Sequence, residues 1–550
     1  MAAALLQLQR HLPAMVGFAL LLALPLTLLL SWGVLGFYQR ALLRWMGRNP
    51  PPALAAPGAP TPGAPPPPLV RPAAATPAAP TPPLALLRQR ERRHWLALAL
   101  LWLLIGLSAA LLYLPAHGIG FSPFKLLAIG LVWAAPGWLQ LALMARLPWR
   151  RGLALVLAVF AGLFVAIVPL MIDTSGASLL QLIRWLLGAG LLPLAALTLL
   201  IGIPSLRASA PLLYGPVAGL TLLATLGQPL ILAAFAAGLE RWPVPLGAGV
   251  LALPVLALLP PLLAGALPLH ALSRAIATAY RRGWLSDHSF SLAASALLVL
   301  LLAVAPGWAG SGLAGLLPLL AWLWVPLAIG WLLPRFSQAP PAPATPLLVL
   351  RLFRRPGPVG WLFDQVVQRW RFVGPVLLIT ASDLAARTLD ADELVQFLEG
   401  RLGERFIASV DQLPPAGPSQ ANRDGRFPVQ EYCCYDSSWQ AVLEALLQRS
   451  QVVLMDLRGF GPAHGGCLHE LGRLGASAHL QRVVLLADAS TDRATAAEAF
   501  AAGTTSLAAG EAPALQWVEE RRRRHPTMEA VLAALTANPP ACAPPATHLA

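Results

Sequence analysis

The 550-residue sequence has few charged side chains, one lysine and four cysteines. Charged residues make up 12% of the chain, against about 25% in a soluble globular protein, so the composition excludes an ordinary soluble chain. Lys125 is the only lysine, and arginine therefore supplies nearly all of the formal net charge of +14. The cysteines lie in the last quarter without regular spacing, which argues against a disulfide framework: Cys433, Cys434, Cys467 and Cys542.

Apolar residues are abundant instead, at 57% of the chain with a mean hydropathy of +0.64. The excess of alanine, proline, leucine and arginine is typical of a GC-rich bacterial genome. Through the first 335 positions, apolar runs recur near the ~20 residues that a spanning helix needs. They predict nine transmembrane helices, at about 14–37, 95–114, 126–144, 153–172, 182–203, 212–237, 245–268, 290–308 and 313–334.

The arginines predict the orientation of these helices. Loops at 40–93, 146–151 and 274–282 are rich in arginine, whereas the alternate loops carry little basic charge. By the positive-inside rule, the N-terminus lies outside and the region after the last span lies in the cytoplasm, at a bacterial inner membrane. Because the basic residues lie between apolar runs, they indicate topology and not nucleic-acid binding. The helix centres hold almost no ionisable residue, which disfavours a transporter and leaves a scaffold or a lipid site open.

Composition divides the chain into six parts. The two Pro/Ala-rich linkers and the tail have too little apolar surface to fold, so we expect them to be disordered. The parts are an anchor helix at 1–48, a linker with a basic collar at 49–93, an eight-helix membrane domain at 94–335, a second linker at 336–346, an α/β domain at 347–537 and a tail at 538–550.

After residue 346, short apolar runs alternate with amphipathic segments. The apolar runs predict strands at 347–353, 375–380, 452–455, 483–486 and 516–518. Between and after them, the spacing predicts helices at 359–370, 391–407, 438–449, 467–474 and 494–502. This alternation is typical of a parallel, three-layer α/β domain, in which ligands bind beyond the carboxyl ends of the strands.

Polar residues follow two of these strands. Asp456 ends one strand, and Arg458 and a glycine-rich turn come directly after it. His464 lies in that turn and Glu470 in the helix after it, and Asp488 follows the next strand. We therefore expect all five at one edge of the sheet. Arg458 suits a phosphate as a bidentate donor, and Asp488 suits ribose hydroxyls. Structural roles fit them too, because Arg458 can pair with Asp456 or Asp488, and an aspartate can cap a turn.

Histidine and cysteine lie near the same turn. His464, Cys467 and His469 match no zinc-ligand spacing, and the adjacent Cys433 and Cys434 would make poor co-ligands. A free cysteine is most often a buried apolar residue. The sequence therefore predicts no metal site.

Three stretches of this region resemble the Toll/interleukin receptor (TIR) domains and, more distantly, the nucleoside deoxyribosyltransferases. VLLITASDLAARTLDADELVQFLEGRL resembles the first TIR strand, its turn at Ser382 and Asp383, and its helix. SSWQAVLEALLQRSQVVLMDL resembles the TIR helix that begins with tryptophan, here Trp439, and GGCLHEL resembles the helix start Trp-Cys-x-x-Glu-Leu. The resemblance spans Pro375 to Leu486, and Gly466 stands where the family has tryptophan.

The resemblance implies a TIR-like, flavodoxin-like sheet and, as in catalytic TIR domains, NAD as a substrate, with no other cofactor. It assigns cleavage of the nicotinamide–ribose bond to Glu470, whose carboxylate would stabilise an oxocarbenium-like transition state. The helix dipole would keep that carboxylate ionised. Ser382, Asp383 and Trp439 would help to bind the ligand. A glutamate that caps a helix and a tryptophan of the core are the structural alternatives.

The sequence thus predicts an inner-membrane protein that presents a TIR-like domain for signalling, nucleotide binding or NAD cleavage. Its expected partners are the lipid bilayer and a second copy of the same domain. A non-catalytic interaction module and a transporter with a regulatory domain are the alternatives.

Overall fold

The computed structural model describes residues 2–48, 82–145, 206–207, 209–236, 270–336, 344–352, 362–380, 389–414, 420–508, 511–520 and 528–537, with single residues between 154 and 180. The chain forms two compact units. The helical unit consists of Met1–Phe37, His94–Phe336 and Leu389–Leu398. The α/β unit consists of Tyr38–Arg93, Ser337–Thr388 and Glu399–Ala550.

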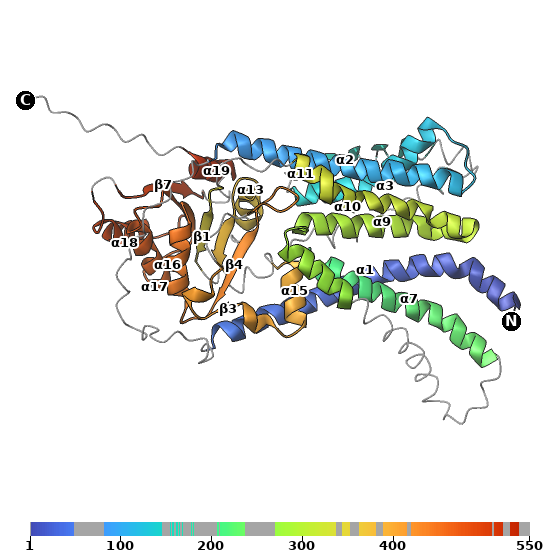
Figure 1. The fold of residues 1–550 in the computed structure, drawn as a ribbon, viewed down its shortest axis with the longest axis horizontal. Helices are drawn as coiled ribbons and strands as arrows, with labels where there is room; N and C mark the ends of the chain where they lie inside the picture. The colour runs from blue at the N-terminus through green and yellow to red at the C-terminus, as the bar shows by residue number, and fades with distance from the viewer. Residues whose placement is uncertain are drawn as a thin grey trace, which may run out of the picture. The chain divides into compact units, whose positions relative to one another are not determined.

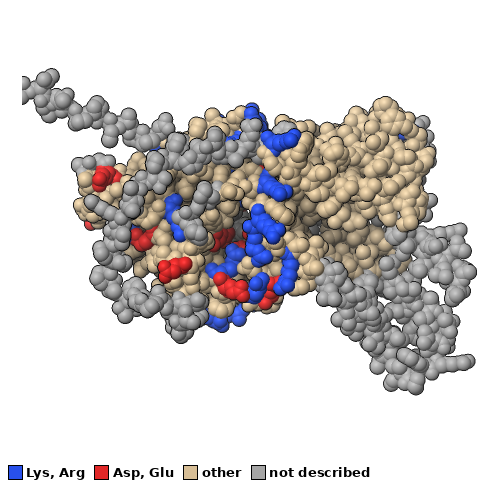
Figure 2. Space-filling model, viewed as in Figure 1, with Lys and Arg blue, Asp and Glu red and all other residues tan. Residues whose placement is uncertain are grey.

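Long apolar helices run through the first of these units (Figure 1). On the face drawn in Figure 2, the described surface of these helices is almost bare of charged side chains. The helical segments are α1 (Ala2–Met46), α2 (Leu84–Ala116), α3 (Pro123–Met144), α7 (Ser209–Ala236), α9 (Asp287–Ser311), η4 (Gly312–Leu323), α10 (Trp324–Leu327), η5 (Ala328–Leu332) and α11 (Leu333–Phe336).

Five helices in the described ranges are long and apolar enough to cross a membrane, and they indicate a membrane protein. They are Met15–Met46, Leu84–Ala116, Pro123–Met144, Asp287–Val304 and Gly312–Arg335. α7 covers the helix predicted at 212–237 but is not one of these five. The predicted spans at 153–172, 182–203 and 245–268 lie wholly or mostly outside the described residues. The count of nine spans therefore stays a prediction.

Glycines let α2 and α3 pack closely. A Cβ atom at Gly137 would lie 1.8 Å from Cδ2 of Trp102, so the indole ring rests directly on the glycine backbone. A Cβ atom at Gly106 would lie 2.3 Å from the carbonyl oxygen of Gly130. Small residues at such contacts are how apolar helices associate without a hydrophobic driving force between them.

The α/β unit contains one seven-stranded sheet in which every pair of neighbouring strands is parallel. This confirms the predicted parallel α/β sheet. Strands β5 and β6 are buried along their whole length, which is why they appear in the sequence as continuous apolar runs. The strands are β1 (Leu347–Arg351), β2 (Val376–Ile379), β3 (Phe406–Ile407), β4 (Val429–Cys434), β5 (Val452–Asp456), β6 (Arg482–Ala487) and β7 (Ala514–Glu519).

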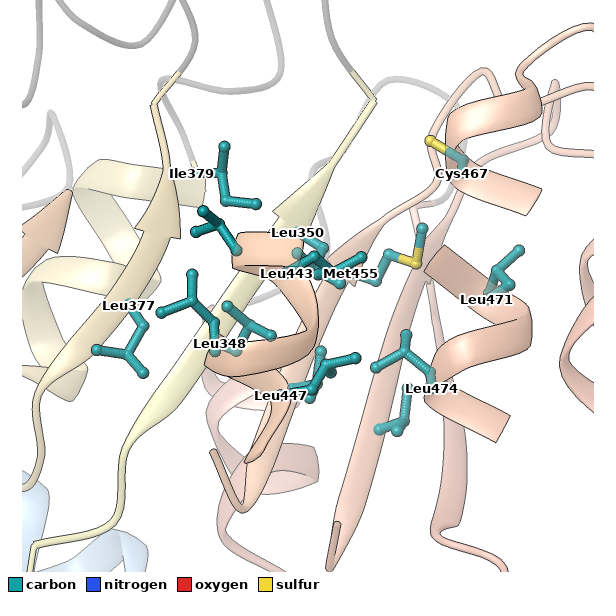
Figure 3. Packing of buried hydrophobic residues seen from close by; sticks show 14 of the residues in the cluster. Leu348, Leu350, Leu377, Ile379, Leu443, Leu447, Met455, Cys467, Leu471 and Leu474 are labelled. Carbon is teal, nitrogen blue, oxygen red and sulfur yellow. The ribbon is translucent and has the colours of Figure 1, made fainter. Parts of the chain in front are cut away.

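Helices cover both faces of the sheet. On one face, α16 (Trp439–Arg449) and α17 (Gly465–Gly475) bury their leucines against β1, β2 and β5 (Figure 3). On the other face lie η6 (Phe363–Val367), α13 (Gln368–Trp370) and α19 (Met528–Thr536). α18 (Arg493–Thr504) packs against α17. The result is the predicted three-layer arrangement.

The strands lie in the order β3-β4-β2-β1-β5-β6-β7. Without the two-residue edge strand β3, the order is 3-2-1-4-5-6, which is a doubly wound order different from the flavodoxin-like 2-1-3-4-5. The difference arises because β1, which precedes the TIR-resembling region, lies between β2 and β5. The TIR-like, flavodoxin-like assignment is therefore not confirmed.

The helix predicted at 391–407 is shorter than expected. α15 (Ala391–Leu398) ends before Gly400, whose φ of +75° stops the helix, and η7 (Leu402–Arg405) and β3 follow. β4, with the sequence VQEYCC, was not predicted. Its first three residues are polar or only half-buried, so it lacks the continuous apolar run of the other central strands.

The first turns of α2 belong to the α/β unit. Leu87 is fully buried in the core cluster that contains Trp370. Arg88 pairs with Glu529 of α19 at 3.1 Å, and Glu91 pairs with Arg369 of α13 at 3.1 Å. The predicted basic collar is thus part of this fold.

The crossing of α17 and α18 depends on two glycines. A Cβ atom at Gly475 would lie 2.1 Å from the carbonyl oxygen of Phe500, and one at Gly503 would lie 2.1 Å from that of Gly472. A Cβ atom at Gly472 itself would meet only the Ala499 oxygen, at 3.8 Å. Gly472 is therefore a matched control for Gly475 in the same helix.

We expect Gly475→Ala to lower the free energy of unfolding of the α/β unit by about 1–3 kcal/mol, because the two helices must separate. Gly472→Ala should be neutral or stabilising by up to about 1 kcal/mol, because alanine favours a helix. Urea-dependent labelling of the buried thiols of Cys433, Cys434 and Cys467 in the full chain measures both effects. Equal losses in the two variants would contradict this account of the crossing.

Candidate functional site

Arg458 joins the carboxyl ends of β5 and β7. Its Nε donates to Oδ1 of Asp456 at 2.8 Å, and its Nη2 donates to Oδ2 of Asp456 at 2.6 Å. Its Nη1 donates to Oε2 of Glu520, directly after β7, at 2.8 Å. Arg458 is only 2% exposed, so these contacts form a buried, charge-assisted network.

Because of this network, Arg458 stays charged, and each of its three side-chain nitrogens already donates a hydrogen bond to a carboxylate. Burial by itself would lower the pKa of Arg458, but the hydrogen bonds and charges of Asp456 and Glu520 outweigh burial and raise it. A phosphate that used this guanidinium would have to displace the carboxylates, and breaking a buried ion pair costs about 3–5 kcal/mol. Asp456 and Arg458 therefore lock the sheet edge in this structure.

Asp488 closes the loop after β6 onto the loop after β5. Its Oδ1 accepts hydrogen bonds from the backbone of Gly459 at 3.1 Å, and from the backbone and hydroxyl of Ser490 at 2.9 and 2.7 Å. Burial would raise the pKa of Asp488, but these hydrogen bonds, with that of Thr491, lower it. Gly459 has a φ of +80°, a conformation that favours glycine at this close contact.

Glu470 lies in the second turn of α17 and is only 3% exposed. In the part of the chain that the structure describes, its Oε2 has no hydrogen-bond partner, while the thiol of Cys467 bonds to the carboxyl group. Burial raises the pKa of Glu470 to about 8, and the bond from Cys467 opposes this rise. At neutral pH the group is mainly protonated, whereas the resemblance implied an ionised carboxylate.

Cys467 is buried beside this carboxyl group. Burial, and then the charge and hydrogen bond of Glu470, raise the pKa of Cys467 to about 12. A neutral thiol is a hydrogen-bond donor and a poor nucleophile. Among the residues described, no group of three or more His, Cys, Asp or Glu is placed to hold a metal ion.

Trp439 packs as a core residue at the start of α16. It is half-buried against the core cluster of this face. A Cβ atom at Gly466 would lie 3.9 Å from its Cη2, so the ring covers the first turn of α17. The ring of His469 meets it edge-on, with 5.9 Å between the centroids.

Side-chain alternation places the predicted residues on two faces of the sheet. In β5, Val452 and Leu454 pack in the cluster under α19, and Asp456 continues the same alternation. Glu470 belongs to α17, whose apolar residues pack on the opposite face. The structure thus brings Asp456, Arg458 and, through Gly459, Asp488 together but separates them from Glu470. The predicted ligand residues Ser382 and Asp383 lie outside the described residues.

Arg351 was missed in the sequence. It ends β1, is 4% exposed, and pairs in register with Asp456 of β5. The backbone N–H of Leu352 donates to the carbonyl oxygen of Asp456 at 3.2 Å. The strand order reverses between β1 and β5, so Arg351 lies at the switch point of the sheet. The signal available in the sequence was the arginine at the end of the apolar run LLVLR.

Comparisons of the chain with protein-family models, with curated proteins and with solved structures found no match. The fold therefore defines a class only: a protein that combines apolar helices suited to a membrane with a doubly wound, parallel α/β unit.

The raised pKa of Glu470 predicts a pH dependence of stability. A carboxyl group that binds its proton more tightly when folded stabilises the fold below its ordinary pKa of 4.5 and loses this effect as the pH rises through about 8. We expect the free energy of unfolding to fall between these values by at most about 1.4 kcal/mol per pH unit from this group.

Glu470→Gln should remove this part of the slope, because an amide does not titrate. The exposed Glu498→Gln of α18 should leave it unchanged. Thermal unfolding of the full chain across this pH range measures both. A slope that persists in Glu470→Gln would show that the group is not protonated in the fold.

Proposed function

We propose that this chain is a bacterial inner-membrane protein whose α/β unit, on the cytoplasmic side, binds a phosphate-bearing, nucleotide-like ligand for signalling. The reversal of strand order between β1 and β5 carries this proposal. In doubly wound sheets, nucleotides bind beyond the carboxyl ends of the strands at this switch point. The apolar helices would anchor the unit in the lipid bilayer.

The chemistry of the strand ends supports an anionic ligand. Arg351 ends β1 at the switch point, and its planar guanidinium suits phosphate oxygens. The residue is only 4% exposed, so a phosphate would reach it by exchanging with its contacts in the protein. The pair of Asp456 and Arg458 holds the neighbouring strand end in a fixed position. A rigid edge reduces the ordering that a ligand must impose when it binds.

Binding without turnover fits Glu470 better than cleavage of NAD. The carboxyl group is buried, is mainly protonated at neutral pH, and belongs to the face of the sheet opposite Asp456. A ligand at the edge would then act through domain association, with a second copy of the α/β unit as partner.

Arg351→Gln should weaken ligand binding by at least about tenfold, which corresponds to about 1.4 kcal/mol, because it removes the positive charge at the switch point. Arg482→Gln is the matched control. Arg482 is also a buried arginine, but it begins β6 and so lies at the amino ends of the strands, where its Nη1 donates to the Ala534 oxygen at 2.8 Å.

Equilibrium binding of labelled NAD and ATP to the full chain in lipid nanodiscs measures these effects. Absence of binding to the unmodified chain, or equal losses in the two arginine variants, would contradict the proposal. The same samples report NAD loss. Turnover that disappears in Glu470→Gln would replace ligand binding with cleavage as the function.

The proposed orientation predicts which side exposes the C-terminal end. In inside-out membrane vesicles, added protease should remove a tag placed after Ala550, whereas intact spheroplasts should protect it. A tag between Met1 and Ala2 should give the reverse pattern. Protection of the C-terminal tag in inside-out vesicles would contradict the cytoplasmic placement.

A further inference from the structure

Two buried histidines from different helices meet inside the helical unit. Nε2 of His94, in α2, lies 3.2 Å from Nδ1 of His288, in the first turn of α9. The two residues are 3% and 4% exposed. The indole ring of Trp95 packs against both imidazoles, at centroid distances of 5.3 and 5.1 Å. The histidines therefore form a hydrogen-bonded pair enclosed by protein.

Two charged groups lie beside the His288 side of the pair. Oδ2 of Asp287 lies 4.0 Å from Nε2 of His288, on the side of the ring away from His94. Nη1 of Arg207, from the turn before α7, lies 3.9 Å from the same carboxylate oxygen. Asp287 from α9 and, beyond it, Arg207 thus place one negative and one positive charge beside the His288 ring.

Other titratable groups lie one turn away. On α2, Arg90 and Glu91 precede His94 by four and three residues, on the same side of the helix. The hydroxyl of Tyr280, ahead of α9, donates to the carbonyl oxygen of Ser286 at 3.3 Å.

A reciprocal cap fixes the start of α9. The backbone N–H of Ser286 donates to Oγ of Ser289 at 2.7 Å, and that of Ser289 donates back to Oγ of Ser286 at 3.3 Å. This cap has the geometry of a capping box, which holds the first helical turn in place. His288 lies within this turn, so its ring is presented to His94 by a rigid backbone.

The hydrogen bond between the rings limits the protons that the pair can hold. One nitrogen of the contact must donate and the other must be unprotonated. One extra proton turns one ring into an imidazolium that still donates, and Asp287 offsets its charge. Two extra protons would set N–H against N–H across this 3.2 Å contact, between two positively charged rings whose centroids are 5.4 Å apart.

We propose that His94 and His288 together form one proton-binding site of the helical unit. The site takes a single proton from the water at the end of the spans where α2 and α9 begin. Ionisable groups buried among apolar helices mark functional sites more often than they serve as packing. A second proton breaks this hydrogen bond between α2 and α9. Occupancy of the site therefore reports the pH on that side, which the arginine distribution assigns to the cytoplasm.

Solid-state NMR of the full chain in nanodiscs, labelled with ¹⁵N-histidine, tests the site directly. His94→Gln and His288→Gln assign the two rings. We expect the pair to titrate in two steps at least about one pH unit apart, because coupled groups share macroscopic steps. Loss of either ring should leave the other with a single step.

His117→Gln is the control. His117 follows the other end of α2, where its Nδ1 faces the Tyr113 oxygen at 3.0 Å, and its replacement should leave the two steps unchanged. Independent titration of His94 and His288 with one midpoint, or no protonation of either ring between about pH 4 and 9, would overturn the proposal.

A phenylalanine variant provides a second test if the glutamine variants fail to fold. The double change of His94→Phe and His288→Phe keeps the aromatic packing against Trp95 but removes the titrating nitrogens. Proton uptake per chain, measured after a downward pH step in weak buffer, should be one proton lower in this variant before the second step begins. Equal uptake by the two proteins would overturn the proposal.

Discussion

The buried contact of Arg458 with Asp456 and Glu520 is the constraint on which the edge of the α/β unit depends. The guanidinium is stable away from water only while both carboxylates remain in place. β5 and β7 are therefore held at a fixed spacing with β6 between them. The backbone carbonyl of the same Asp456 accepts a hydrogen bond from the backbone N–H of Leu352, directly after β1. The network therefore also fixes the position of the strand end at the switch point.

Most of the sheet could be predicted because strands buried on both faces are continuous apolar runs. β1, β2, β5 and β6 have this pattern, and a three-layer α/β fold follows from their alternation with helices. β4 could not be found in this way, since two of its first three residues are polar and all three are only half-buried. The strand order depends on where each crossover packs in space, and nothing local in the sequence records it.

The candidate site was predictable only in part. Polar residues after a strand must lie at the carboxyl edge, and Asp456, Arg458 and Asp488 do so. The partner of Arg458 was hidden because Glu520 lies 62 residues further along the chain. For Glu470, the signal was present but unused: Cys467, Leu471 and Leu474 line the buried side of α17, and a residue three positions after Cys467 shares that side.

The docking of the first turns of α2 on the sheet has a practical consequence. Arg88 and Glu529 are partners although 441 residues separate them, and Leu87 is part of the core cluster that contains Trp370. Scission of the backbone between Phe336 and Thr345 would thus leave the two pieces attached to each other. A recombinant fragment starting at Leu347 would expose the apolar surface that Leu87 covers and should be prone to aggregate.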